Sequence, residues 1–231
     1  ATQISATVSG VTPGPHQLEV KTAAGKTGFN GITFHLLGAG YNPNVVLVSP
    51  PVDATIPVIQ NAIEAASGET LIVVQPGTYY QPINLNKSGV KLQGYGPGNP
   101  DVGIGGGGSV LDQRFVVGGQ NGLIVVGPAG GFSASFPAQI DGFKIMAARD
   151  EQDVGGGLHV DLNGQNLMIG NNLIQSNGGN FGGGITLGEP YRGDNNNDNI
   201  RIHHNRILQN GGISLAGGVG IFNGADTYEI D

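Results

Sequence analysis

The sequence contains no cysteine, few charged residues and no long apolar run. The absence of cysteine excludes a disulfide framework, a zinc–thiolate site and a thiol nucleophile, and it gives no information on redox compartment. Basic residues are scarce, since 10 Lys and Arg stand against 17 Asp and Glu, for a formal net charge of −7. Because nucleic-acid affinity depends on clusters of Lys and Arg, we expect no nucleic-acid partner.

No run of about 18 apolar residues is present, so the sequence predicts no membrane span. The first residues, Ala1 to Ile4, lack the charged and apolar regions of a signal peptide. We therefore expect a soluble segment whose targeting signal lies upstream of Ala1.

Glycine, in contrast, is abundant, with 43 residues among 231, and asparagine is also frequent. Both residue types tolerate positive φ, which tight turns require. Between them lie short, regular runs of Val, Ile and Leu. Many short strands joined by tight turns are therefore expected, and the sequence predicts an all-β fold.

Residues 1–41 are expected to form a module of their own. The turn Thr12-Pro13-Gly14-Pro15 precedes strand-like segments at residues 17–21 and 32–36, which a turn at residues 24–26 separates. This pattern resembles the closing strands of an immunoglobulin-like IPT/TIG domain, which implies that the opening strands of that domain are missing. A simple β-hairpin leader is the alternative. Residues 42–52, which are rich in proline, are expected to be a linker.

Residues 55–66 are predicted to form a helix that begins after the N-cap Asp53 and stops at Gly68. Its apolar face consists of Ile56, Ile59, Ile63 and Ala66. Short strand segments follow at residues 71–74, 75–79, 83–85 and 90–94. Their close spacing leaves no room for helical crossovers.

The amphipathic helix, the apolar strand, Pro76-Gly77-Thr78-Tyr79 and the pattern Val90-x-Leu92-x-Gly94 resemble the opening of pectin-lyase-like right-handed parallel β-helices. The resemblance implies a solenoid over residues 53–231, an N-terminal helix that caps its open end, and an extracellular or cell-surface location. A cap is needed because the terminal coil otherwise leaves strand edges and apolar side chains unpaired.

An internal repeat supports this reading. Residues 166–179 align without gaps to residues 199–212, and a glycine-rich strand follows each segment. In this alignment Asn172 matches Asn205 and Asn177 matches Asn210, so we expect stacked asparagine side chains that hydrogen-bond between coils. The residues predicted to point into the core are Ile169, Leu173, Ile185, Ile200, Ile202, Ile207 and Ile221.

The final residues Tyr228–Asp231 align to Ile200–His203, so the sequence ends on the first strand of a new coil. We therefore expect the solenoid to be truncated at its C-terminal end and its partners to include the remaining coils of the same protein. The same alignment predicts Glu229 over Arg201 and Asp231 over His203. It places Asp141 two coils below His203, with Gly170 between them.

No nucleophile elbow, P-loop or His-Glu-x-x-His motif is present. In the family that this sequence resembles, pectate lyases use calcium-binding carboxylates with an Arg or Lys base, and polygalacturonases use a set of Asp residues. Neither set matches this sequence residue by residue. The candidate catalytic residues are Arg201, His203 and Asp231, on the outer face of one sheet. The candidate substrate-binding residues are Glu189, Tyr191, Arg192, Asp194 and Glu229, most of them in the long polar segment 188–198 that is expected to wall this face.

A second acidic group, formed by Asp150, Glu151 and Asp153, is a candidate calcium site, since calcium prefers several oxygen ligands. No other cofactor is expected. Two classes of function remain open. The first is a secreted, carbohydrate-directed protein, a polysaccharide lyase, hydrolase or epimerase that acts on a polysaccharide or cell-surface glycan. The second is a noncatalytic solenoid scaffold or adhesin module of a larger multidomain extracellular protein.

Overall fold

The computed structural model describes residues 7–18, 23–25, 31–99, 106–116, 122–150 and 154–231. Within these residues the chain is mostly β, so the predicted all-β class is confirmed. Four sheets are parallel, and a separate hairpin is antiparallel. No helix in the described part of the chain is long and apolar enough to cross a membrane.

Sheet I has seven strands, which are β3 (Asn44–Val48), β4 (Thr70–Val74), β7 (Val90–Gly94), β10 (Gln139–Asp141), β14 (Met168–Gly170), β18 (Ile200–His203) and β22 (Tyr228–Ile230). Sheet II has β5 (Gly77–Tyr79), β8 (Ser109–Asp112), β11 (Phe143–Met146), β15 (Leu173–Gln175) and β19 (Arg206–Leu208). In each sheet the strands are neighbours in chain order.

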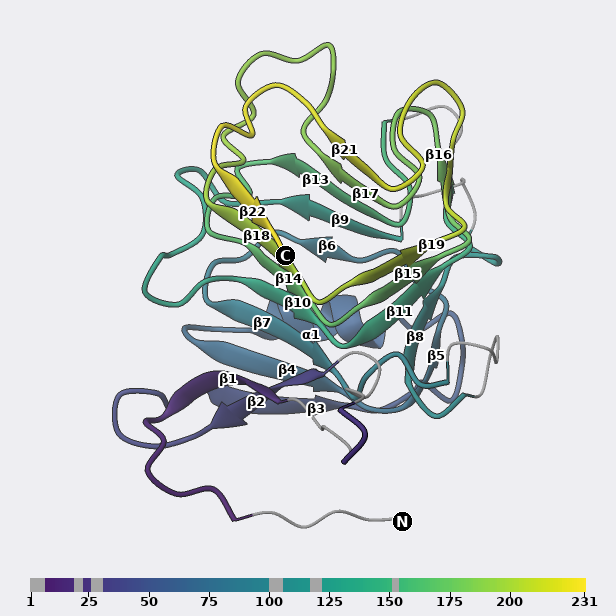
Figure 1. Ribbon diagram of the computed structural model, residues 1–231. Coiled ribbons are helices and arrows are strands. Elements are labelled where there is room, and N and C mark those ends of the chain that lie inside the picture. The colour runs from purple at the N-terminus through teal and green to yellow at the C-terminus, as the bar shows by residue number, and fades with distance from the viewer. Residues whose placement is uncertain (1–6, 19–22, 26–30, 100–105, 117–121, 151–153) are drawn as a thin grey trace.

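Sheet III is short and has β12 (Arg149–Asp150), β16 (Gly178–Gly179) and β20 (Gly211–Gly212). Sheet IV has β6 (Asn84–Leu85), β9 (Leu123–Val126), β13 (Leu158–Leu162), β17 (Ile185–Leu187) and β21 (Val219–Ile221). The chain visits sheets I, II and IV in turn, and each circuit lies on the one before it (Figure 1).

The pairing register confirms the predicted repeat. Ile169 pairs with Ile202 in sheet I, and Gly178 pairs with Gly211 in sheet III, so both pairs follow the alignment of residues 166–179 with 199–212. In the last strand, Glu229 pairs with Arg201, as predicted. Since every described pairing in sheets I to IV is parallel, residues one circuit apart in the sequence become neighbours on the same face.

The core contains most of the residues predicted for it. Ile169, Ile185, Ile200 and Ile202 are buried members of one apolar cluster. Ile207 and Ile221, in the last full circuit, are only partly buried and pack against that cluster. The prediction that Leu173 points into the core is wrong, although its side chain is buried, because Leu173 pairs with Lys144. Its neighbour Ile174 pairs with Ile145 and belongs to the core instead. The strand alternates sides, so an error of one residue exchanges the faces.

Both predicted asparagine ladders are present at the turns around sheet II. The side-chain amide of Asn172 donates to Oδ1 of Asn205 at 3.0 Å, and that of Asn177 donates to Oδ1 of Asn210 at 3.0 Å. Each side chain also bonds backbone groups of neighbouring circuits. Asn172 is fully buried. These asparagines are therefore structural.

The helix α1 (Val58–Ala65) begins later than predicted. Pro57, which lacks a backbone N–H and restricts the residue before it, stands directly in front of the helix. Asp53 accepts hydrogen bonds from Thr55 in the turn upstream and does not cap the helix. The amides of Ile59 and Gln60, in the first helical turn, donate to Oε1 of Gln81. Ile59 and Ile63 are fully buried, next to β3 and β4.

The predicted linker 42–52 contains a strand, which corrects that assignment. Its apolar run from Val45 to Val48 pairs in parallel with β4, and prolines on either side confine β3 to Asn44–Val48. Upstream, β1 (Gly14–Leu18) and β2 (Ile32–Leu36) form the antiparallel hairpin. The hairpin begins earlier than the predicted first segment, of which residues 19–21 lie outside the described residues.

Candidate functional site

The outer face of sheet I carries the predicted catalytic residues at its last strands. Arg201 Nε lies 3.3 Å from Glu229 Oε2, and Arg201 Nη2 donates to Asp231 Oδ2 at 3.0 Å. All three side chains are exposed to solvent. The hydrogen bond from Arg201 lowers the pKa of the Asp231 carboxyl group. Ion pairs of this exposed kind contribute little to stability, so they mainly fix geometry.

His203, in contrast, is buried, and burial lowers its pKa below the ordinary value of 6.5. Its ring occupies the space over Gly170. A Cβ on Gly170 would lie 2.4 Å from His203 Cε1 and 2.8 Å from Asp141 Oδ2. The predicted column of Asp141, Gly170 and His203 is therefore correct in register, but it is closed by protein atoms.

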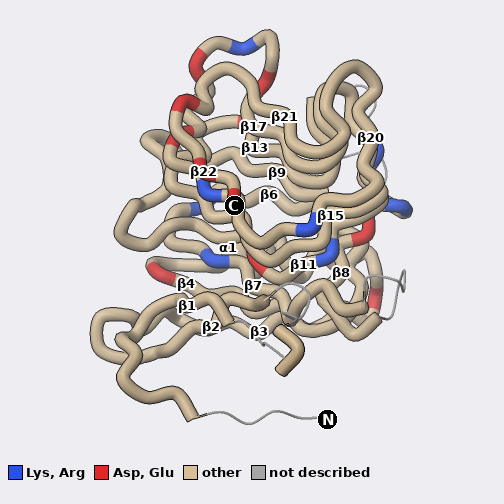
Figure 2. The backbone as a smooth tube through the Cα atoms, in the orientation of Figure 1, with Lys and Arg blue, Asp and Glu red and all other residues tan. Residues whose placement is uncertain are grey.

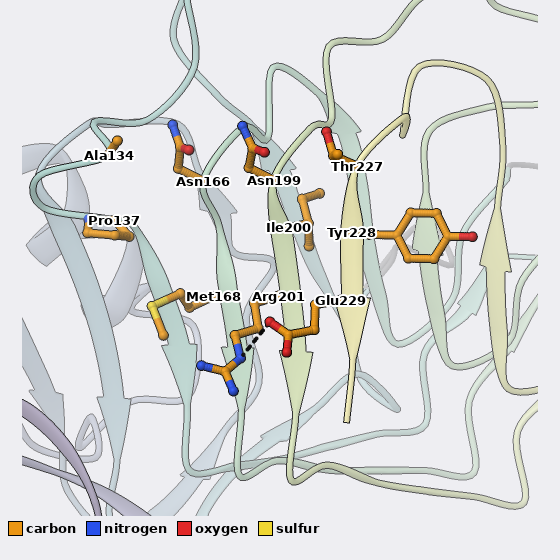
Figure 3. A pocket seen from close by; sticks show the side chains of 10 residues that line it. All are labelled: Ala134, Pro137, Asn166, Met168, Asn199, Ile200, Arg201, Thr227, Tyr228 and Glu229. Atoms are coloured by element: carbon orange, nitrogen blue, oxygen red, sulfur yellow. Dashed lines mark ion pairs between the residues drawn. The ribbon is translucent and has the colours of Figure 1, made fainter.

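A pocket of about 400 Å³ lies on the same sheet beside these residues. Figure 3 shows Met168, Arg201, Tyr228 and Glu229 among its lining residues, with Arg201 and Glu229 reaching toward each other from neighbouring strands. None of the predicted substrate-binding side chains of segment 188–198 lines it.

Segment 188–198 lies beside sheet IV instead. Arg192 Nη1 donates to Asp161 Oδ1 at 2.5 Å, and Arg192 Nη2 donates to Glu189 Oε1 at 3.0 Å. Asp161 belongs to β13. The structure therefore divides the predicted groove into two groups: Arg201, Glu229 and Asp231 on sheet I, and the Arg192 cluster at the end of sheet IV.

The buried residue His159 completes this second group, which we call the Arg192 cluster (His159, Asp161, Glu189 and Arg192). Ligand atoms of His159, Asp161 and Glu189 all lie within 4.8 Å of one another, which is close enough for a shared metal ion. Arg192 already provides a positive charge to both carboxylates, so a metal ion would have to compete with the guanidinium.

Aromatic rings lie next to the Arg192 cluster. Tyr191 is 84% exposed, and its ring meets the edge of Phe181 with centroids 5.4 Å apart. Phe222 also packs edge-to-face with Phe181, with centroids 6.3 Å apart. Charged residues are sparse among the residues that the structure describes (Figure 2), and here a charged cluster lies beside an exposed ring.

Two further predictions have different outcomes. Asp194 accepts from the backbone N–H of Asn196 at 2.8 Å and lines a separate cavity of about 620 Å³ with Phe222 and Gly224. The predicted calcium ligands lie outside the description, because the side chain of Asp150 and all of Glu151 and Asp153 are not described.

Sequence reasoning missed His159 and Asp161. The available signal was the spacing His159-x-Asp161 inside the strand Leu158–Leu162, since alternate residues share one face. Asp161 could not be linked to Arg192 from sequence, because the position of segment 188–198, which contains Arg192, is set by loop packing. Comparison of the chain with family models, curated proteins and solved structures finds no match.

Proposed function

We propose that this chain is part of a secreted right-handed parallel β-helix protein, of the pectin-lyase-like kind, that binds polysaccharide at the Arg192 cluster and Tyr191. The single observation that carries the proposal is the Arg192 fork, held by Asp161 and Glu189 beside an exposed aromatic ring. The β-helix part rests on the parallel sheets, the circuit-by-circuit register and both asparagine ladders.

The chemistry of the cluster suits sugar hydroxyl groups. The carboxylates accept hydrogen bonds, the guanidinium donates them, and a sugar ring presents both kinds of group on its equatorial hydroxyls. The apolar face of a sugar ring can stack on Tyr191, whose ring is largely solvent-exposed. Binding of a fixed sugar orientation therefore needs no movement of the strands.

The charge balance favours a neutral glycan over an acidic one. Asp161 and Glu189 together carry two negative charges against the single positive charge of Arg192, and the chain as a whole has a net charge of −7. A uronate carboxylate would meet this excess negative charge at close range. We therefore expect gluco- or xylo-oligosaccharides to bind more tightly than oligogalacturonate.

The proposal is tested by calorimetric titration of the intact chain with neutral oligosaccharides and with oligogalacturonate. Tyr191→Ala and Arg192→Ala should each weaken neutral-glycan binding by about tenfold or more, the loss of about 1.4 kcal/mol. Tyr228→Ala, which removes an exposed ring from sheet I, is the matched control and should bind as the wild type does. Absence of binding, or equal binding by Tyr191→Ala, contradicts the proposal.

A noncatalytic scaffold is the second candidate, and the asparagine ladders favour it because they serve the stacking of circuits alone. The same titration separates the two. A scaffold predicts no glycan affinity in the wild type or in the variants. Release of new reducing ends from the neutral glycan would show that the chain also cleaves what it binds.

A further inference from the structure

The outer face of sheet I contains a row of buried polar side chains. Lys91, Gln93, Gln139 and Asp141 alternate with core residues such as Leu92 and Ile140, so they point away from the core, yet none is more than 5% exposed. Something other than the parallel sheets must cover them.

The β1–β2 hairpin provides part of this cover, through polar contacts. Thr33 donates to Asp141 from its hydroxyl at 2.7 Å and from its backbone N–H at 3.2 Å. Gln17 exchanges two hydrogen bonds with Asn171, at 2.8 and 3.1 Å. The apolar side chains Leu18 and Phe34 alternate with these residues and are 46% and 41% exposed.

The contacts of Thr33 with Asp141 and of Gln17 with Asn171 are hydrogen bonds, and the apolar side chains Leu18 and Phe34 lie on the other face of the hairpin. Docking depends on hydrogen bonds, each with a net contribution of only about 1 kcal/mol, because water can replace the partner. A change in the charge of one interface residue can therefore shift the balance between docked and undocked hairpin.

His35 is the residue in the interface whose charge changes near neutral pH. Gln93 Nε2 donates to Asp141 Oδ1 at 3.0 Å, so Gln93 turns its Oε1 toward His35 Nε2, 3.2 Å away. His35 Nε2 must therefore donate. His35 Nδ1 lies 2.7 Å from the Tyr41 hydroxyl and accepts its proton. Burial raises the Tyr41 pKa to about 12, so the hydroxyl keeps that proton.

We propose that the β1–β2 hairpin is a pH-dependent cover of sheet I, docked while His35 is neutral and released when His35 is protonated. Protonation of Nδ1 removes the acceptor of the Tyr41 hydroxyl proton and adds a charge near the buried ammonium group of Lys91. The titratable groups that face His35 are Tyr41, Lys91 on β7 and Asp141 on β10. Release uncovers Gln93 and Asp141 of the polar row, on the sheet that carries the 400 Å³ pocket.

The direction of the effect follows from the pKa of His35, which is lowered from 6.5. Burial is the largest cause, and the charge of Lys91 also lowers the pKa, whereas the hydrogen bond with Gln93 and the charge of Asp141 raise it. A base with a lowered pKa in the docked state favours docking when it is neutral. Docking is therefore unaffected above pH 6.5 and weakens as pH falls below this value toward the docked pKa.

Hydrogen–deuterium exchange of the intact chain tests the proposal at about pH 7.5 and about pH 5.0, on either side of the ordinary histidine pKa. After correction for intrinsic exchange rates, protection of the amides in β1 and β2 should fall severalfold at the lower pH, because undocking opens the hairpin to exchange. Protection of β7 and β10 should not change.

Two variants assign the effect. His35→Gln keeps one donor and one acceptor without a titrating group, so its hairpin should stay protected at both pH values. His16→Gln, on the opposite face of the same hairpin, where His16 contacts the Thr12 carbonyl, should behave as the wild type does. Three results overturn the proposal: equal hairpin protection at both pH values in wild type, a pH response that persists in His35→Gln and so belongs to another group such as His203, or parallel loss of protection in β7 and β10.

Discussion

Single polar side chains connect successive circuits where the backbone turns. In the circuit below, the Phe143 amide donates to Asn172 Oδ1 at 2.9 Å, and Asn172 Nδ2 donates to the Ile140 carbonyl at 3.0 Å. Asn172 Nδ2 also donates to Asn205 Oδ1 in the circuit above, at 3.0 Å. Apolar packing alone would leave those buried backbone groups without partners. The asparagine is therefore required by the turn and not by the sheet.

Replacement of Asn172 by Ala should lower the free energy of unfolding by about 2–6 kcal/mol, because two buried backbone groups lose their partner at about 1–3 kcal/mol each. Urea denaturation measures the change. Asn61→Ala, on the exposed face of α1, is the matched control and should change stability by less than about 0.5 kcal/mol. A loss for Asn172→Ala as small as the control would show that water satisfies the turn.

A glycine on sheet I is constrained by its neighbours in the same way. The Cβ of Gly170→Ala would lie 2.4 Å from the ring of His203 and 2.8 Å from the carboxylate of Asp141. We expect a loss of about 1–3 kcal/mol from overpacking, measured by urea denaturation. Gly211→Ala, whose Cβ meets no atom within 4 Å, should leave stability nearly unchanged. Equal effects of both substitutions would mean that His203 swings away freely.

At the scale of strands, the residues of one apolar column differ in how deeply they are buried. Ile202 and Ile230 are in-register partners, but Ile202 is 2% exposed and Ile230 is 51% exposed. Ile202→Ala should cost about 2–5 kcal/mol, whereas Ile230→Ala should cost less than about 1 kcal/mol, since the transfer and cavity terms both scale with burial. Thermal unfolding of the two variants checks this, and an unchanged midpoint for Ile202→Ala would contradict the register.

The sequence was sufficient for the elements that repeat. A gapless alignment predicts the pairing of Ile169 with Ile202 and of Arg201 with Glu229, because parallel stacking converts sequence offset directly into contact. The error at Leu173 is one of facing within the repeat, whereas the errors in element boundaries arise where no repeat exists. The strand β3 lies between prolines that resembled a linker, and Pro57 delays a helix whose apolar face was read correctly.

The candidate site was harder to predict for the same reason. Arg192 and Glu189 were identified as residues of one polar segment, but their partner Asp161 lies a circuit earlier, and only the conformation of segment 188–198 brings them together. The cover over Asp141 comes from Thr33, which is more than a hundred positions away in the chain and follows no periodicity. Contacts of irregular segments are set by packing, which a repeat pattern does not encode.

For the molecule as a whole, the most consequential buried charge lies on sheet I. Lys91 is 1% exposed, its ammonium group donates to the Pro137 carbonyl and lies 4.6 Å from the centroid of the Phe136 ring. Burial lowers its pKa from 10.5 to about 8, against the opposing charges of Glu69 and Asp141. The folded state therefore binds this proton less well than the unfolded state does.

The sign of the resulting pH dependence is fixed by this lowered pKa. Below about pH 8 Lys91 is charged in both the folded and the unfolded state, so the cost of burying it is constant. Between about pH 8 and pH 10.5 the folded chain releases the proton first, so stability rises with pH.

Urea denaturation of the wild type from about pH 7 to about pH 9.5 should show a gain of about 2 kcal/mol in the free energy of unfolding. That range stays below the pKa of Tyr41 and Tyr79, which burial raises to about 12. Lys91→Met should be more stable than the wild type at about pH 7, because methionine fills a similar volume without a charge. It should also lose most of the rise, and the rest belongs to the buried Lys144, whose pKa burial also lowers. Lys87→Met is the control, since Lys87 bonds the exposed end of α1, and it should keep the wild-type slope. An identical slope in Lys91→Met would assign the rise to another group and would show that the Phe136 ring and the Pro137 carbonyl compensate the buried ammonium charge.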